Sequence, residues 1–366
     1  MQAVTTIGLD IAKSVFQVHG VDAEGMVVFR RQLRRRQVLP FFKRLSPCLV
    51  GIEACATSHH WSRELQALGH TVRLMPPAYV KPYLKRQKND AADAEAICEA
   101  VTRPSMRFVE TKTKDQQACL MLHRTRHLFI RQQTAVINAT RAHLAEFGIV
   151  APVGRNGVEE LLDVVADPDD DRVPEVAREC LAALGAQLRM LKAQILEFDR
   201  RILAWHRSNE TSKRLDEVPG VGPVLATALV ASVANPRTFR SGRDFSAWVG
   251  LVPKQNSSGG KETLGSITKQ GDRYLRSLFT AGALTAAGIG RIEVGNGPHL
   301  RFVLAATVVR PVLHEMPALF ESVTSAICQL DLATHRVGER LLADLAWMVR
   351  CLAGPIAETA SETVDS

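Results

Sequence analysis

The first 75 residues carry a strand pattern that narrows the choice of folds. Three short apolar runs follow one another at 5–10, 15–21 and 26–33, and the short turns between them include Gly20 and Gly25. A helix pattern at 37–45, an apolar run that ends at Glu53, a helix pattern at 59–68 and a further run at 71–75 come next. Hairpin-linked strands followed by alternating helices and strands predict an α/β domain with helices on the faces of its sheet.

Four carboxylates stand at positions of this domain that can converge. Asp10 closes the first apolar run and Glu53 closes the fourth. Asp90 and Asp93 open a helix pattern at about 90–102, and their i,i+3 spacing puts both on one face of that helix. The order of strands and helices is also the one expected of a ribonuclease-H-like sheet. A nuclease-like fold would need acids at such positions to hold two divalent metal ions.

Carboxylate oxygens are the hard ligands that suit Mg²⁺, which takes its remaining ligands from water and phosphate. Two such ions about 4 Å apart can clamp the attacking and leaving oxygens of a phosphodiester. The sequence therefore predicts that Asp10, Glu53, Asp90 and Asp93 are catalytic metal ligands for two Mg²⁺ ions, with Mn²⁺ as a substitute. Each acid also has a structural explanation, because strand ends are often solvated and the first turn of a helix favours Asp.

The charge of the chain favours a polyanionic partner. The 366 residues carry a net charge of +8, and much of it lies in two runs that flank the acids in sequence. These runs consist of Arg30, Arg31, Arg34, Arg35, Arg36, Lys43 and Arg44, and of Lys81, Lys85, Arg86 and Lys88. We expect Arg34, Arg35 and Lys88 to contact nucleic acid, with double-stranded DNA as an expected partner, although a solvated face would also produce such runs.

The compartment is predicted from the cysteines and from hydropathy. Seven cysteines, an odd number without paired C-x-x-C spacing, argue against a zinc site or a disulfide framework and favour a reducing cytoplasm. No stretch reaches the roughly 18 uninterrupted apolar residues of a membrane span. We therefore expect a cytoplasmic protein with no membrane partner.

Residues 113–208 read as helical apart from the connections at 148–152 and 167–171. The second long helix has an apolar a/d seam in steps of three and four, formed by Leu181, Leu184, Leu188, Leu191, Ile195, Phe198, Ile202 and Trp205. This seam either packs on the preceding helix as a hairpin or joins subunits into a homo-oligomer, a dimer or tetramer.

The preceding helix, at about 116–147, has a basic stripe of His123, Arg124, Arg126, His127, Arg131, Arg141 and His143. Arg124 and Arg126 are its predicted nucleic-acid contacts.

A third, mostly helical domain begins at about 213. Residues 215–226 resemble a helix-hairpin-helix, in which the turn with Gly220 and Gly222 opens a helix whose free N–H groups can bind phosphate. An ordinary Pro/Gly helix start would look similar. The polar stretch 256–261 contains Ser258 and Gly259, and Lys269 follows it as a further predicted nucleic-acid contact. A surface loop would have the same composition.

Over nearly all of its length the chain resembles the DEDD transposases related to the Piv invertase, the insertion-sequence recombinases guided by a bridge RNA. The matching segments are 8–13, 52–54, 88–94, 218–222, 258–259 and 267–271. Their order and spacing carry the resemblance, since no single segment is specific.

The resemblance implies a RuvC-like domain at 1–108, a helical coiled-coil segment at 109–210 and a C-terminal transposase domain at 211–352, before a disordered tail at 353–366. It implies that Asp10, Glu53, Asp90 and Asp93 are the metal-binding tetrad and that Ser258 is the nucleophile. A structured guide RNA would then supply sequence choice by base pairing.

The predicted function is therefore that of an RNA-guided DNA recombinase that excises and inserts a mobile element. The nearer alternative is a junction-resolving or structure-specific nuclease, which would use the same acids with water as nucleophile. An actin-like ATPase would need a second Asp-Gly-Gly-type loop, which the sequence lacks. A non-catalytic nucleic-acid-binding protein would not explain four acids beside basic runs, where they would repel the ligand unless a metal intervened.

Overall fold

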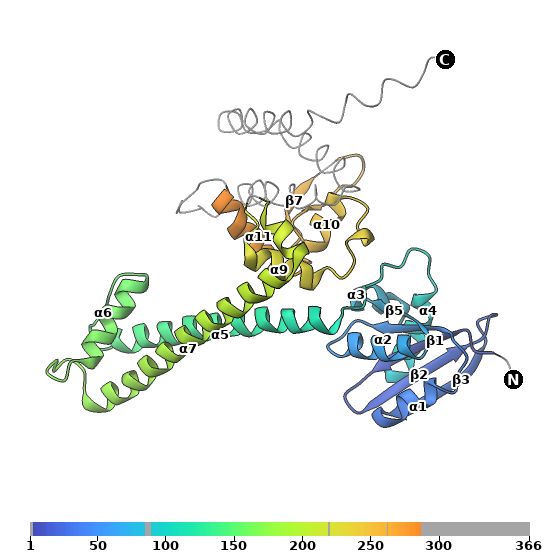
Figure 1. Cartoon of the computed structure of the whole chain (residues 1–366), viewed down its shortest axis with the longest axis horizontal. Helices are drawn as coiled ribbons and strands as arrows, with labels where there is room; N and C mark the ends of the chain where they lie inside the picture. Colours follow the sequence, from blue (N-terminus) through green and yellow to red (C-terminus); the bar gives the residue numbers. More distant parts are fainter. Residues whose placement is uncertain (1–2, 85–88, 219, 262, 287–366) are drawn as a thin grey trace, which may run out of the picture. The chain divides into compact units, whose positions relative to one another are not determined.

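The computed structural model describes residues 3–84, 89–218, 220–261 and 263–286. The chain divides into two compact units (Figure 1). The first consists of Met1–Arg214 with Ala226–Asn235, and the second of Leu215–Leu225 with the residues from Pro236 onward. Lys88, the predicted tail at 353–366 and the predicted third domain beyond 286 lie outside the described residues.

The N-terminal part of the first unit is built on one mixed five-stranded sheet, so the predicted α/β domain is confirmed. Its strands are β1 (Thr6–Ile11), β2 (Val15–Val21), β3 (Val27–Arg34), β4 (Leu49–Glu53) and β5 (Thr71–Met75). They lie in the order β3-β2-β1-β4-β5. The β1, β2 and β3 strands form antiparallel hairpins, whereas β1 and β4, and β4 and β5, pair in parallel. This is the strand order expected of a ribonuclease-H-like domain.

Helices cover both faces of this sheet. The helices α1 (Val38–Phe42) and α2 (Ser58–Ala67) pack on one face, where Phe16 and Trp61 meet edge to face with ring centroids 5.0 Å apart. The helix α4 (Asp90–Val101) packs on the other face against β1, β2 and β4. The single turn α3 (Pro77–Val80) lies between β5 and α4 in the chain, and 3₁₀ turns occur at Arg35–Gln37, Lys81–Tyr83 and Pro236–Thr238.

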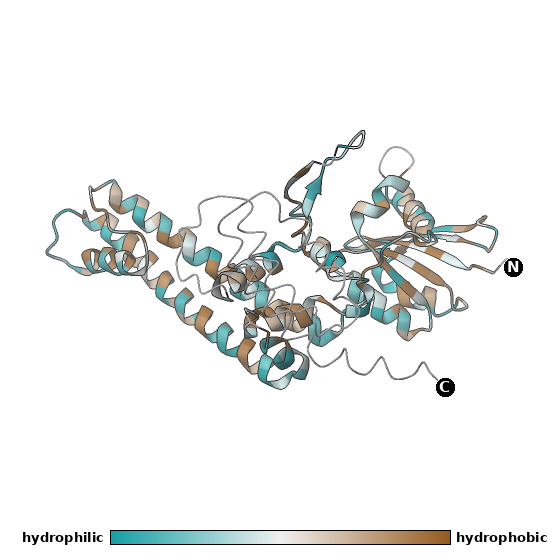
Figure 2. Ribbon diagram, turned by 90° about the horizontal axis from the view of Figure 1, so that it is seen from above, coloured by the Kyte–Doolittle hydropathy of each residue, from teal (hydrophilic) through white to brown (hydrophobic). Residues whose placement is uncertain are grey.

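A long antiparallel hairpin follows, made by α5 (Lys114–Ala145) and α7 (Glu175–Ser208), with α6 (Arg155–Ala166) between them in sequence. Figure 2 shows apolar and polar residues alternating along both long helices. The predicted seam of α7 is used within the chain: Leu188 and Leu191 cluster with Val136 of α5 and Val158 of α6. Farther along, Phe198 meets Phe129 of α5 at 5.5 Å between ring centroids. Of the two predicted alternatives for the seam, the structure contains the hairpin.

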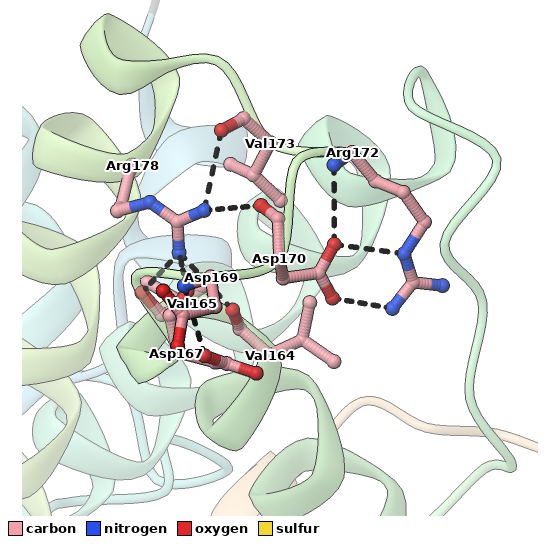
Figure 3. A network of polar contacts seen from close by, with 8 residues as sticks. All are labelled: Val164, Val165, Asp167, Asp169, Asp170, Arg172, Val173 and Arg178. Atoms are coloured by element: carbon pink, nitrogen blue, oxygen red, sulfur yellow. Dashed lines mark hydrogen bonds and ion pairs between the residues drawn. The ribbon is translucent and has the colours of Figure 1, made fainter.

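Two arginines, Arg172 and Arg178, order the connection between α6 and α7, and Arg172 does so by pairing with Asp170 (Figure 3). Arg178 donates hydrogen bonds to the main-chain oxygens of Val165 (3.0 Å), Asp170 (2.5 Å) and Val173 (3.3 Å). It also donates to the carbonyls of Val164 and Asp167, which are at the C-terminal end of α6 or just beyond it. These carbonyls have no partner inside the helix, so the guanidinium replaces the missing N–H donors and orders the acidic loop.

The second unit is mostly helical, as predicted, but it also contains a hairpin of short strands. The helices are α8 (Glu210–Asp216, mostly in the first unit), α9 (Pro223–Ser232, which spans both), α10 (Gly242–Val249) and α11 (Arg273–Ala286). The strands β6 (Pro253–Gln255) and β7 (Leu264–Ile267) pair in antiparallel fashion. The core of this unit includes Phe245, whose ring meets that of Phe279 at 6.0 Å.

Candidate metal centre

Two strand ends supply the first two acids. Asp10 lies near the end of β1 and Glu53 at the end of the parallel strand β4, where Leu9 is paired with Ile52. Side chains two residues apart in a strand share a face. Gly8 and Gly51 face α4, so Asp10 and Glu53 also lie on the α4 side of the sheet. Both side chains are half-buried. The predicted convergence of the two strand ends is therefore present.

The start of α4 supplies the other two acids. Asn89 caps this helix, because its side-chain oxygen accepts a hydrogen bond from the N–H of Ala92 at 2.8 Å. Asp90 and Asp93 then fall in the first turn, where the helix dipole favours negative charge. Asp90 is exposed and Asp93 is half-buried.

Two glycines bring α4 close to the sheet. A Cβ on Gly8 would lie 2.0 Å from the carbonyl oxygen of Ala94, and one on Gly51 would lie 2.8 Å from the Cβ of Val101. Real Cβ atoms essentially never approach other atoms so closely, so both positions require glycine for the observed spacing. Each glycine stands two residues before one of the four predicted acids. Sequence reasoning missed this role, although the Gly-x-acid pattern occurs at both strand ends.

The acids form a compact cluster. Carboxylate oxygens of Asp10, Asp90 and Asp93 all lie within 4.8 Å of one another. The pKa of Asp10 is raised from 3.8 to about 6, first by burial and then by the negative charges of Asp93, Asp90 and Glu53. Glu53 is not one of the three clustered ligands, yet its charge acts on Asp10. The charges of the other three predicted acids thus all act on Asp10.

This donor set fits a hard divalent cation. Carboxylate oxygens from the end of β1 and the first turn of α4 can share an ion, and a bound cation would offset the unfavourable negative charge at Asp10. Mg²⁺ is bound in proteins by one or two carboxylates, and waters and substrate phosphates supply its other ligands. Three or four acidic side chains provide enough carboxylates for this kind of site.

Ser258, the predicted nucleophile, is in the second unit. It lies at the tip of the β6–β7 hairpin, where its N–H and C=O exchange hydrogen bonds with Lys261 at 3.3 and 3.1 Å. Gly259 and Gly260 between them have φ values of +56° and +78°. Positive φ at both central residues matches the two-residue turn that suits a twisted hairpin. Ser257 and Ser258 are both exposed.

The predicted nucleic-acid contacts have different surroundings. Arg34 is exposed, and Arg35 is stacked on Trp61 with Cζ 5.1 Å from the ring centroid. Arg124 is exposed on α5, whereas Arg126 on the same helix is paired with Asp199 of α7 at 2.5 Å.

Two further members of the α5 stripe support the fold. His123 is buried and hydrogen-bonded to Thr227 at 3.0 Å. Arg141 donates to the carbonyls of Ala151 and Pro152 at 2.9 and 2.7 Å. The basic stripe predicted for α5 is therefore only partly available to a ligand.

The remaining predicted contacts lie in the second unit. Gly220 has a φ of +83° in the turn between α8 and α9, and Gly222 directly precedes α9. A Cβ on Gly282 of α11 would lie 2.0 Å from the carbonyl oxygen of Gly220, so α11 packs tightly on this turn. Lys269 is exposed and has a φ of +57°. Phosphate binding by these residues stays a prediction.

Within the described residues, no helix combines the length and apolar character required to cross a membrane.

Comparisons with known proteins point to one family. Residues 7–149 match a family model described as DEDD_Tnp_IS110, Transposase, and residues 212–293 match the model of the Transposase IS116/IS110/IS902 family. A Pseudomonas aeruginosa protein named "Probable family 20 transposase" is 50% identical over 281 residues, which cover 76% of this chain and 83% of that protein.

Two relatives are named for their mobile elements. The transposase for insertion sequence element IS1328 of Yersinia enterocolitica is 40% identical over 279 residues, or 76% of this chain and 83% of the relative. The transposase for insertion sequence element IS1111A of Coxiella burnetii is 38% identical over 284 residues, or 77% of this chain and 78% of the relative. Each of these similarities extends over about three quarters of this chain.

Proposed function

Because this chain belongs to the IS116/IS110/IS902 family of insertion-sequence transposases, we propose that it excises and inserts DNA by metal-assisted cleavage and rejoining with Ser258 as nucleophile. The observation that carries the metal-dependent part is the cluster of Asp10, Asp90 and Asp93, whose oxygens lie within 4.8 Å. The family membership supports a DNA substrate, since a transposase must cut and join DNA.

The four acids would hold the ions and the scissile phosphate. Asp10, Asp90 and Asp93 would hold a first Mg²⁺, and Glu53, whose charge reaches Asp10, would help them to hold a second. When bound, the ions would neutralise phosphate charge and lower the pKa of an attacking hydroxyl. Mn²⁺ has similar ligand preferences and would substitute.

Ser258 would attack the phosphorus atom. A new Oγ–P bond forms as the bond from phosphorus to the departing DNA oxygen breaks, and that oxygen takes up a proton while the serine loses one. The strand stays linked to the protein as a phosphoserine ester, which conserves bond energy for rejoining without ATP. A serine hydroxyl needs activation, so the hairpin tip and the acid cluster must act together, from one subunit or two.

The proposed assembly is a homo-oligomer, a dimer or tetramer, that holds double-stranded element ends and target. We further propose that a structured guide RNA selects the DNA sequence by base pairing, while the protein contacts the sugar-phosphate backbones of the nucleic acids. The exposed arginines Arg34 and Arg124 suit that role.

The test is detection of the covalent intermediate on a denaturing gel with labelled DNA, Mg²⁺ and the guide RNA. Wild type should give a protein–DNA adduct. Ser258→Ala should give none and should lose recombination while it still binds DNA, since the change removes only an exposed hydroxyl. Ser257→Ala is the matched control, because this serine is also exposed in the same hairpin, and it should keep most of the adduct.

The opposite pattern, an adduct in Ser258→Ala and none in Ser257→Ala, contradicts the assignment.

A second candidate, a structure-specific nuclease with water as nucleophile, is favoured by one observation: all four acids belong to the first unit and need no group from the second. This nuclease would give free nicked ends and no adduct in the wild-type protein.

A further inference from the structure

A group of basic side chains surrounds His59 on the α2 side of the sheet. His59 and Arg63 belong to α2, Lys112 precedes α5, and Arg124 is on α5. The N–H of Lys112 donates to Nδ1 of His59 at 3.2 Å, and Arg63 Nη1 donates to the carbonyl of Lys112 at 2.5 Å. The two hydrogen bonds therefore hold α2 against the segment that precedes α5, and Arg124 of α5 is close enough for its charge to act on His59. No local sequence pattern indicates this grouping.

Three positively charged side chains lie near His59. The pKa of His59 is lowered to about 4, first by burial and then by the charges of Lys112, Arg63 and Arg124. The imidazole is thus neutral near pH 7. Because Nδ1 accepts the Lys112 N–H, the proton of the ring is on Nε2, which is a donor. The group consequently offers three cations and a neutral N–H donor.

Arg63 is fixed in place by one hydrogen bond, and its guanidinium has further N–H donors. The side chain is half-buried and anchored through Nη1, and its buried Nε–H has no hydrogen-bond partner within the described chain. An unsatisfied buried donor costs about 1–3 kcal/mol. A small rotation of the guanidinium would offer its remaining N–H groups to an oxyanion, and its planar fork matches phosphate better than an ammonium does.

We propose that His59, Arg63, Lys112 and Arg124 form a site for a backbone phosphate of a nucleic acid strand, and that the strand continues along α5 to Arg131. Arg124 and Arg131 are both exposed and are seven residues apart on one helix face, about 10.5 Å along the axis. Arg131 can therefore contact a phosphate farther along the strand. The inference rests on the proposed function, because that function requires strands to be held outside the metal centre.

The experiment measures binding by fluorescence anisotropy at several salt concentrations, with duplex DNA, single-stranded DNA and RNA of one sequence as probes. EDTA is present, so no probe is cut. Loss of one phosphate contact in Arg124→Gln should reduce the slope of log K against log salt by about 0.9 for a duplex or about 0.7 for a single strand. At 0.1 M salt the Kd for a duplex should rise about eightfold. The probe whose slope changes identifies the strand that occupies the site.

Two variants separate charge from structure. Arg63→Lys keeps the charge but loses the fork, so it should keep the salt slope and bind more weakly. Arg200→Gln on α7 is the matched control: this exposed arginine is already paired with Glu197 at 3.8 Å, and its loss should leave both slope and Kd unchanged.

An unchanged slope for Arg124→Gln with every probe overturns the proposal. If Arg124→Gln binds more weakly at an unchanged slope and also has a lower Tm, the loss of affinity comes from damage to the fold rather than from loss of a phosphate contact, and the proposal is overturned as well. Neither result depends on the Ser258 adduct, since the probes stay intact. Failure of this site and failure of the proposed chemistry can therefore be told apart.

Discussion

Asp10 is the acid whose ionisation the surrounding protein opposes most clearly. Its pKa is about 6 in the folded, metal-free chain, against 3.8 for an ordinary aspartate. The folded state therefore binds this proton more tightly than the unfolded state does. The resulting stability is fully present below about pH 4 and is lost as the pH rises through about 6. A bound cation reverses the effect, because it favours the ionised form.

We expect Asp10→Asn to raise the free energy of unfolding in EDTA at pH 7.5, by at most about 3 kcal/mol and by less after screening by solvent. At pH 4 the difference from wild type should vanish. Mg²⁺ should stabilise wild type at pH 7.5 but have little effect on the variant, and cleavage should be lost. Denaturant unfolding at the two pH values tests this, with the exposed Asp169→Asn as control. A variant less stable than wild type in EDTA would contradict the raised pKa.

The identity of the acids could be predicted from sequence, because strand ends and a helix start are visible as patterns. The close approach of oxygens from Asp10, Asp90 and Asp93 could not, because it depends on how tightly α4 packs on the sheet. The His59 group could not be predicted for the same reason. Arg63 is on the same helix as His59, but Lys112 and Arg124 are more than 50 residues farther along the chain, and only the folded packing brings them near.

At the scale of elements, the packing of α4 on the sheet decides whether a metal centre exists. Gly51 is the more informative of the two contact glycines, because its obstacle is a side chain, that of Val101, at 2.8 Å. At Gly8 the obstacle is the carbonyl oxygen of Ala94 at 2.0 Å, which no side-chain change can remove.

Gly51→Ala should lower the free energy of unfolding by about 1–3 kcal/mol, the usual cost of overpacking a core. Adding Val101→Ala should make room, so the double variant should cost less than the sum of the two single variants. Denaturant unfolding of all four proteins measures this coupling. Strict additivity would mean that α4 does not press on β4 as described.

The sheet and most helices were predictable, because their apolar spacing is regular. The β6–β7 hairpin was not predicted, since strands of three and four residues with mostly exposed side chains leave no alternating pattern. The Gly259-Gly260 pair was the available signal, because two glycines between short runs favour a two-residue hairpin turn.

At the scale of the whole molecule, the question is which surface would join subunits in the proposed homo-oligomer. A heptad pattern shows that a helix has an apolar face, but it does not show which partner covers that face. In this chain α5 and α6 cover much of the α7 face, with Leu188 only 7% exposed beside Val136 and Val158. An oligomer would then use a different surface from the seam.

We therefore expect Leu188→Glu to lower the free energy of unfolding by about 3 kcal/mol or more, since it removes buried apolar contacts and buries a carboxylate. The particle mass of the protein that stays folded should be unchanged in light scattering. Met190→Glu makes a comparable change at a position 59% exposed on the same helix, and it should leave stability nearly unaltered. A smaller particle for Leu188→Glu at unchanged stability would show instead that the seam joins subunits, and the hairpin would then have to open for α7 to reach its partner.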